Sequence, residues 1–457
     1  MKIEKIIIIS CVILCFLMII SCNKAQFVQK PNILLICVDD LRPELKSFGA
    51  EYISSPNIDA LAAEGVLFQK HFVNAPSCGP SRYTLLTGQY GPTSNDALFQ
   101  RAGKVAQGTV LNPSMPEWFR DHGYALVSVG KVSHHPGGMG GKNWNDSTII
   151  EMPDAWDKHL MPVSEWEHPR SAMHGLAHGE IRIKSSDMDV FQTVEGNDNS
   201  YPDGIIADET VKQLKALSKD DKKPFFLAVG IIKPHLPFGA QKSYIDRYDG
   251  IKLPAIEHPQ KPEEKITWHG SNEFKQYNRW EKDPNTDKVF ADEMRLHYAA
   301  CVSYADAQVG KIIRELKRNG TDKNTIIILW GDHGWHLGEH AIWGKHSLFE
   351  ESLRSPMIIQ YPKMENRNSN TNAIVETLDI FPTLCDLTNL ETPKFVPGVS
   401  LRPILENLGT SGHLAYSYFN NAMTVRTQTH RMTLHMDDYV ELYDHRTLEK
   451  ETKNIAN

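Results

Sequence analysis

Four short apolar runs, each followed closely by charged or imidazole side chains, predict buried strands that end in polar loops. The runs span residues 32–38, 124–129, 225–229 and 325–330. The polar residues that follow them are Asp39-Asp40, Lys131, Lys233 with His235, and Asp332-His333. Each predicted strand therefore delivers a polar group just beyond its carboxyl end.

Two stretches with apolar residues at helical intervals lie between these strands. They span residues 57–64 and 291–317, and the second stops before Gly320. Strands that alternate with helices favour an α/β fold built on a doubly wound sheet. Because ligands bind beyond the carboxyl ends of the strands in such sheets, we expect the polar groups to converge at one edge.

The rest of the chain divides into a leader, a main domain and a smaller C-terminal part. Residues 137–203 are rich in Gly, Asp and His without periodicity, so we expect an excursion over the site edge. From about Gly398 the segments are shorter and alternating, which predicts a small α+β subdomain. The expected ranges are 1–22 for the leader, 23–395 for the main domain and 396–457 for the subdomain.

The first residues have the pattern of a secretory signal: Lys2 and Lys5 precede an apolar run over residues 6–20. The run ends at Ile19-Ile20-Ser21-Cys22, which resembles a bacterial lipobox with Cys22 as the lipidated residue. A plain signal peptide and an uncleaved anchor are the alternatives. We expect an exported lipoprotein, periplasmic or associated with the outer membrane of a Gram-negative bacterium, with the membrane leaflet left open.

Composition narrows the class of protein. The chain has 457 residues, of which 41% are hydrophobic and 23% charged, as in an ordinary globular protein. The formal net charge of -7 gives no support for nucleic-acid binding. An anionic substrate stays possible, because a local basic pocket can lie within an acidic surface.

The 7 cysteines include three in the leader. No CxxC pair or zinc spacing occurs among the other four, and nothing requires the two disulfides that an exported protein could form. Cys78 has a polar setting. The remaining three lie in apolar surroundings and are expected as small core residues: Cys37, Cys301 and Cys385.

The segment around Cys78 combines a nucleophile with an anion site. Pro80 suits the first turn of a helix and Gly88 its end, which places Cys78 at the helix N-terminus. Free backbone N–H groups at that position favour an anion. Arg82 lies four residues on and projects from the same face. The alternative is a capped helix with a buried thiol.

The run Cys78-Gly79-Pro80-Ser81-Arg82, followed by Leu86-Thr87-Gly88, resembles the signature of type I sulfatases. Glu441-Leu442-Tyr443-Asp444 resembles the C-terminal end of that family, so the resemblance covers nearly the whole mature chain. The nearest subgroup is the iduronate-2-sulfatase type, within the alkaline phosphatase superfamily. The resemblance implies an alkaline-phosphatase-like, doubly wound mixed sheet. It also implies that a maturation enzyme oxidises Cys78 to formylglycine, whose hydrated aldehyde attacks sulfur.

The acidic strand ends predict a metal site. Three carboxylates at one point repel each other unless a cation lies among them, and oxygen-rich ligation favours calcium or magnesium over zinc. Solvated acids in strand-end loops are the alternative. His333 is an unusual calcium ligand, although the iduronate-2-sulfatase type has histidine there. The resemblance implies one calcium ion held by Asp39, Asp40, Asp332, His333 and the modified Cys78.

The resemblance also assigns the groups that handle sulfate and protons. His134 is expected as the base, with a shift to His135 left open, and His235 as the acid for the leaving oxygen. The formal charge of the expected site is plus two, from three aspartates, a divalent ion and three cationic side chains. This charge suits a sulfate ester monoanion and also tolerates a phosphate. The cations expected on the equatorial oxygens are Arg82, Lys131 and Lys345.

We expect an exo-acting enzyme on 2-O-sulfated uronic acid in heparan, chondroitin or algal ulvan fragments, with Trp156 and Trp166 as candidate sugar-stacking groups. Another sulfated hexose, such as galactose 6-sulfate, is the alternative substrate. A phosphate or phosphonate ester hydrolase of the same superfamily is the alternative enzyme, and a non-catalytic glycan-binding lipoprotein the alternative class. The oligomeric state stays open.

Overall fold

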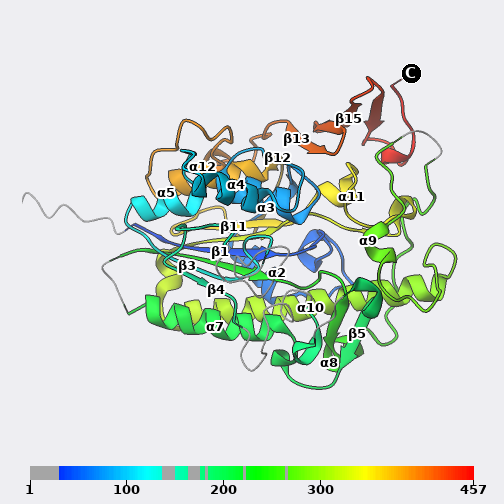
Figure 1. The fold of residues 1–457 in the computed structure, drawn as a ribbon, viewed down its shortest axis with the longest axis horizontal. Coiled ribbons are helices and arrows are strands. Elements are labelled where there is room, and N and C mark those ends of the chain that lie inside the picture. The colour runs from blue at the N-terminus through cyan, green and yellow to red at the C-terminus, as the bar shows by residue number, and fades with distance from the viewer. Residues whose placement is uncertain are drawn as a thin grey trace, which may run out of the picture. The chain divides into compact units, whose positions relative to one another are not determined.

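An eight-stranded mixed sheet lies at the centre of the computed structural model (Figure 1). Strand β1 pairs in parallel with β6 on one side and β8 on the other, and β3 pairs in parallel with β6. The antiparallel strand β11 makes the sheet mixed. In spatial order the strands are β12 (Ser369–Glu376), β2 (Val66–Phe72), β11 (Met357–Gln360), β8 (Thr325–Gly331), β1 (Asn32–Val38), β6 (Phe225–Ile231), β3 (Ala125–Gly130) and β4 (Lys158–Leu160).

The structure describes residues 30–135, 150–162, 175–180, 184–219, 223–262 and 266–456. The predicted leader and Trp166 lie outside these ranges. From Pro31 onward the chain forms one compact unit. Within the described part, no helix combines the length and apolar character needed to cross a membrane.

All four predicted strands and their parallel order are confirmed. The prediction for β1 matches its bounds, whereas β6 and β8 continue to Ile231 and Gly331. Successive residues of β1 point into different cores, as the strand period of two requires. Leu34 and Ile36 belong to one core, and Ile33 and Leu35 to the other.

Helices cover both faces, which confirms the doubly wound arrangement (Figure 1). One core packs beneath α2 (Pro56–Glu64), α7 (Pro202–Leu217) and α10 (Lys288–Arg318). The opposite core packs beneath α3 (Cys78–Thr87), α4 (Ala97–Ala106), α5 (Met115–Asp121) and α12 (Ile380–Leu387). The two predicted helices are α2 and α10, and α10 runs slightly beyond its predicted range at both ends.

The C-terminal part is a smaller antiparallel sheet, which confirms the predicted subdomain, while the boundary at residue 396 stays a prediction. Its order is β13 (Ala415–Phe419), β14 (Ala422–Arg426), β15 (His430–His435) and β16 (Val440–Asp444), preceded by α13 (Arg402–Glu406). Backbone N–H of Tyr418 donates to the carbonyl of Asn74, at 2.9 Å. The subdomain thereby reaches the loop that leads into α3.

Several short elements complete the described chain. The pair β5 (Phe191–Val194) and β7 (Phe238–Gln241) is parallel, and β9 (His336–Leu337) with β10 (Trp343–Gly344) is antiparallel. Short helices are α8 (Lys242–Ile245), α9 (Asn272–Lys275) and α11 (Glu350–Leu353). The three cysteines predicted for the core, Cys37, Cys301 and Cys385, are buried and free.

Candidate active site

The polar groups predicted to converge do so at the carboxyl edge of the large sheet. Asp39 and Asp40 follow β1, Lys131 follows β3, and Asp332 follows β8. All four side chains are fully buried. Ion pairs and hydrogen bonds link them, so the sequence prediction of a single charged site is confirmed in its geometry.

Cys78 is the first residue of α3, as predicted, and Gly88 ends that helix in a left-handed conformation with φ of 65°. Gly79 must lack a side chain, because a Cβ there would lie 2.4 Å from the Cα of Asn95. Asn95 Oδ1 in turn accepts hydrogen bonds from Gly79 N–H and Ser77 Oγ. The start of α3 is therefore held in contact with the neighbouring loop.

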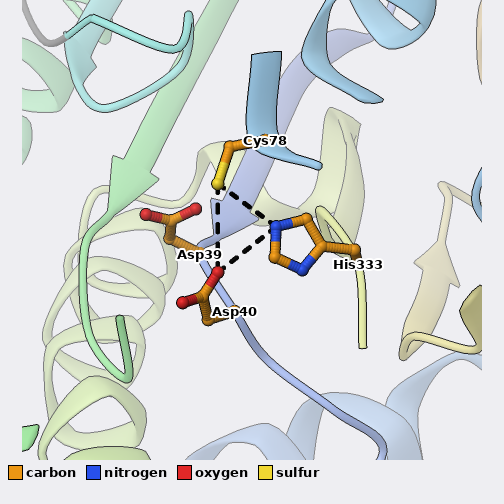
Figure 2. Close-up of side chains that lie close together, drawn as sticks. All are labelled: Asp39, Asp40, Cys78 and His333. Atoms are coloured by element: carbon orange, nitrogen blue, oxygen red, sulfur yellow. Dashed lines mark hydrogen bonds and ion pairs between the residues drawn. The ribbon is translucent and has the colours of Figure 1, made fainter. Parts of the chain in front are cut away.

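Four of the five predicted metal ligands lie together: Asp39, Asp40, Cys78 and His333 (Figure 2). Their candidate ligand atoms all lie within 4.8 Å of one another. His333 Nε2 is 3.2 Å from both Cys78 Sγ and Asp40 Oδ1. His333 Nδ1 lies 2.9 Å from the carbonyl of Gly334, which fixes a tautomer with the Nε2 lone pair facing the group.

These residues fit a divalent cation. Asp40 Oδ2 is buried and has no hydrogen-bond partner. Burial raises the pKa of Asp40 to about 7 and that of Asp332 to about 6. A bound cation would satisfy the unpaired oxygen and restore both carboxylates to their charged form. Two carboxylates with one imidazole form an oxygen-rich set that suits calcium or magnesium.

Asp332, the fifth predicted ligand, lies beside the four clustered ligands and is not one of them. Its Oδ1 accepts the backbone N–H of Asp40 at 2.9 Å, and its Oδ2 lies 3.1 Å from Arg82 Nε. Both oxygens therefore already have protein partners. A direct bond from Asp332 to the ion stays a prediction.

Arg82 contacts the carboxylates of the site and does not line the cavity above Cys78. Its side chain is fully buried and donates to Asp39 Oδ1, to Asp332 Oδ2 and to the carbonyls of Lys131 and Val132. These contacts occupy all three guanidinium nitrogens, so Arg82 holds the carboxylates in place. Contact between Arg82 and the equatorial sulfate oxygens stays a prediction. Burial opposes ionisation of Asp39, but Lys131 and Arg82 outweigh it and hold its pKa well below the usual range.

A cavity of about 380 Å³ opens above Cys78. Lys345 lines it, with Nζ 2.8 Å from Asp40 Oδ1 and 3.2 Å from Cys78 Sγ. Lys131 is paired with Asp39 beneath the site and is not among the residues that line the cavity. Of the three cations assigned to sulfate, Lys345 is thus the one that reaches the cavity in this structure.

The structure distinguishes the two adjacent histidines. His134 lines the cavity, whereas His135 Nε2 lies 3.6 Å from Asp96 and its ring packs on Phe99. His235 also lines the cavity. Its Nδ1 is 2.6 Å from the carbonyl of Leu236, which leaves Nε2 directed toward Asp40, 4.0 Å from its Oδ2. The geometry supports His134 and His235 as the two proton-transfer groups.

The pKa values of both imidazoles are lowered by their surroundings. Burial, followed by the charge of Lys131, holds the pKa of His134 and that of His235 well below the ordinary value. A sulfate ester in the cavity would add negative charge and favour the protonated form. An anion bound in the cavity would therefore raise the pKa of His235.

Glu273 is a site residue that the sequence did not reveal. It lies on α9, and its Oε1 is 3.5 Å from Lys345 Nζ and 3.9 Å from His235 Nε2. The negative charge of Glu273 lowers the formal charge predicted for the site from plus two to plus one. No sequence signal identified it, because α9 is one turn long and follows no predicted strand.

The predicted sugar-stacking role of Trp156 is not supported. Its ring packs edge-on against Phe226, with centroids 6.0 Å apart, near the amino end of β6. That position lies at the opposite end of the strand from His235. Trp166 lies outside the described residues.

Comparisons with known proteins identify relatives over nearly the whole chain. Residues 31–390 match the family model described as Sulfatase, and residues 338–457 match the one described as N-sulphoglucosamine sulphohydrolase, C-terminal. Iduronate 2-sulfatase of Mus musculus is 32% identical over 409 residues, which cover 80% of this chain and 70% of that protein. A sulfatase of Formosa agariphila is 30% identical over 94% of this chain and 84% of its own length.

Solved structures show the same fold. The phosphonate monoester hydrolase of Agrobacterium radiobacter superposes with a TM-score of 0.73 at 22% identity. The match covers 93% of this chain and 92% of that one. At this identity the similarity establishes the architecture alone.

Proposed function

This chain belongs to the sulfatase family, within the alkaline phosphatase superfamily, and is a sulfuric ester hydrolase; from that premise we propose that it removes the 2-O-sulfate of a terminal uronic acid in carbohydrate fragments. The observation that carries the proposal is Cys78 at the start of α3, in contact with His333 and Lys345 beneath the cavity. The identity of 32% to an iduronate 2-sulfatase supports the uronic acid and its 2-O position.

The exo mode of action is supported by the size of the cavity. Its volume of about 380 Å³ is near the lower end of small-molecule sites. Fragments of heparan, chondroitin or algal ulvan contain suitable terminal sugars. A sulfated hexose such as galactose 6-sulfate is the alternative substrate.

The proposal includes one calcium ion and a formylglycine made from Cys78. Asp39, Asp40 and His333 would hold the ion together with residue 78, and Asp332 would orient Asp40 through its backbone N–H. A bound ion would supply Lewis-acid polarisation of a sulfate oxygen, and the modified residue would supply a hydroxyl nucleophile at neutral pH. Burial and then Asp39 raise the pKa of the unmodified Cys78 thiol well above its usual value, so the thiol itself would be a weak nucleophile.

The remaining residues of the site move protons and hold charge. Lys345 stabilises negative charge on the transferring group from the cavity wall. Protonated His235 donates from Nε2 to the alcohol oxygen as the S–O bond breaks. His134 removes a proton from residue 78 in the release of sulfate. Lys131 and Arg82 keep Asp39 ionised for the cation.

Export is also part of the proposal. Residues 1–22 would direct the chain out of the cytoplasm, and lipid on Cys22 would tether it to the membrane. In the periplasm or at the outer membrane the enzyme would meet incoming oligosaccharides. A maturation enzyme that converts Cys78 completes the expected partners, and nucleic acid is not among them.

The test uses oligosaccharides of known sulfation, with desulfation followed by mass spectrometry and NMR. We expect release from the terminal 2-O position and none from internal residues. Release from hexose 6-positions alone, or from internal residues, would contradict the substrate. Faster hydrolysis of a phosphonate aryl ester than of the matched sulfate ester would instead support the superfamily alternative.

A further inference from the structure

A second cavity of about 520 Å³ adjoins the active-site cavity. Four residues line both spaces: Asn95, Asn272, Glu273 and His346. The two cavities therefore adjoin along these side chains, next to Cys78. The volume of the second, outer cavity falls within the range of roughly 300–1,000 Å³ that is typical of small-molecule sites.

The outer wall comes from the C-terminal subdomain. Strands β13 and β14 pair through Phe419 and Ala422, which leaves a two-residue turn at Asn420 and Asn421. Asn420 has φ of 48°, a left-handed conformation that asparagine tolerates. Both asparagines are exposed and line the outer cavity. The hairpin thus presents amide side chains, which both donate and accept hydrogen bonds.

Two stacked aromatic rings lie beside these amides. The rings of His346 and Phe419 stack with centroids 5.4 Å apart and an interplanar angle of 13°. His346 follows Lys345 directly, so the stack joins the catalytic loop to the C-terminal hairpin. Trp268 lines the same space, although Lys261 covers one ring face at 4.0 Å. Aromatic rings bounded by amides are suited to the apolar faces and hydroxyl groups of sugars.

The charge of the outer cavity differs from that of the sulfate site. Among the described residues that line it there is no lysine or arginine, and Glu273 is the one carboxylate. Asn95 keeps Nδ2 as its remaining donor, because Oδ1 accepts from Ser77 and Gly79. An anionic group placed here would lose water and meet no lysine or arginine in the lining, whose basic side chains are the imidazoles of His269, His346 and His435. Glu273 would repel it.

We propose that the outer cavity binds an uncharged sugar residue linked to the sulfated one, and that it discriminates against a second residue carrying carboxylate or sulfate. The inference rests on the proposed function, because it presumes that a sulfated saccharide is the substrate. It goes further by assigning the neighbouring sugar and the hairpin Asn420–Asn421 that recognises it.

The test compares two disaccharides with the same terminal 2-O-sulfated uronate, one with an uncharged second sugar and one with a sulfated second sugar. The wild-type kcat/KM should be at least about 10-fold higher for the uncharged form. Asn421→Arg should narrow that ratio at least about 5-fold by improving the anionic substrate. Met423→Arg is the matched control: Met423 is 62% exposed, lies two residues away and does not line the cavity, so the ratio should not change.

Equal kcat/KM values for the two disaccharides in the wild type would overturn the inference, as would a ratio unaffected by Asn421→Arg. If neither uronate disaccharide is turned over, the proposed substrate fails, and the same ratio is measured on matched galactose 6-sulfate disaccharides. Calorimetry of all four disaccharides with the Cys78→Ala protein provides a readout that needs no turnover. Absence of any preference for uncharged second sugars in that experiment would also overturn the inference.

Discussion

The active site and a second cluster of buried charge in the described chain differ in how completely their charges are paired. In the active site, Asp40 Oδ2 has no hydrogen-bond partner, and burial raises the pKa of Asp40 to about 7. In the C-terminal ion cluster, by contrast, each carboxylate has cationic partners. That cluster consists of Glu350, Arg426, Arg431, His445 and Glu451.

The contacts of Glu451 show what full pairing does. Its carboxylate bonds Arg431, lies 3.1 Å from His445 Nε2 and accepts the backbone N–H of Glu350 at 2.7 Å. Burial opposes ionisation, but Arg431 and His445 together outweigh it and lower the pKa of Glu451 to about 2. Both clusters gather acids and histidine closely enough to hold a metal ion. Complete pairing indicates a structural role, and an unpaired carboxylate oxygen indicates a place for a ligand.

The strongest test of the difference between the active site and the C-terminal ion cluster is a substitution at Cys78. Cys78→Ala should lower kcat on an aryl sulfate by at least about 10³-fold, because the nucleophile is lost. The melting temperature should stay within about 2 °C of the wild type, since Cys78 contributes no ion pair of its own. Steady-state kinetics and calorimetry give the two numbers. An active Cys78→Ala enzyme would exclude residue 78 as the nucleophile.

Mass spectrometry of the peptide that contains residue 78 complements this variant. Active wild-type protein should carry formylglycine at that position. Full activity in protein that contains only unmodified cysteine would refute the modification.

Removal of the divalent ion should have the next largest effect. Chelation followed by desalting should reduce kcat about 10²-fold or more, and added calcium should restore it, because the ion polarises the sulfate oxygen. Asp40→Asn should lose metal and rate together. Elemental analysis should find about one ion per wild-type chain, whereas Glu451→Gln should leave that content unchanged. Metal-free protein with full activity would contradict the site.

His235 can be tested through the leaving group. His235→Ala should reduce kcat about 10²-fold on a sugar sulfate and much less on an aryl sulfate, because a phenolate leaves with little protonation. The variant His135→Ala is the matched control, since His135 lies outside the cavity. Equal losses on both substrates would argue against His235 as the acid.

The sequence predicted the elements in which apolar residues recur at regular intervals. Strand β1 and helix α10 are long, regular and buried, so their apolar spacing identified them. Strand β2 carries Gln69 and Lys70 in its middle, and β11 has four residues, so neither gave a distinct signal. The antiparallel direction of β11 depends on its pairing with β2 and β8, which no local pattern specifies.

The candidate site was predictable where motifs and strand ends coincide. The positions of Asp39, Cys78 and His333 follow from their places relative to β1, α3 and β8. The role of Arg82 could not be deduced, because a cation one turn from Cys78 can face a sulfate or the neighbouring carboxylates equally well. Glu273 could not be found at all, since tertiary packing alone brings α9 to Lys345.

The C-terminal ion cluster is expected to affect stability and leave catalysis intact. Glu451→Gln should lower the free energy of unfolding by about 3 kcal/mol, because it leaves the buried guanidinium of Arg431 without one of its charged partners. Urea unfolding monitored by circular dichroism gives this number. Glu449→Gln is the control, because Glu449 is exposed and should change stability by less than about 0.5 kcal/mol. A loss of kcat above 10-fold in folded Glu451→Gln would contradict the division of roles.

The smallest expected effect is a difference in pH dependence between the two clusters. In metal-free protein, burial raises the pKa of Asp40 to about 7 and that of Asp332 to about 6, from ordinary values near 3.8. Between pH 4 and 7 the folded state then binds more protons than the unfolded state, so stability falls as the pH rises through that window. The lowered pKa of Glu451 acts in the opposite sense, because its stabilisation is present above pH 4.5 and is lost as the pH falls toward 2. Relative to Asp40→Asn, the melting temperature of the metal-free wild type should therefore decline between pH 5 and 7, and saturating calcium should flatten that decline by favouring the ionised carboxylates. The difference in melting temperature between Glu451→Gln and the wild type should stay constant over the same pH range. A melting-temperature difference from Asp40→Asn that moves in favour of the wild type as the pH rises, together with no effect of calcium on that slope, would show that the unpaired carboxylates do not control the active-site edge.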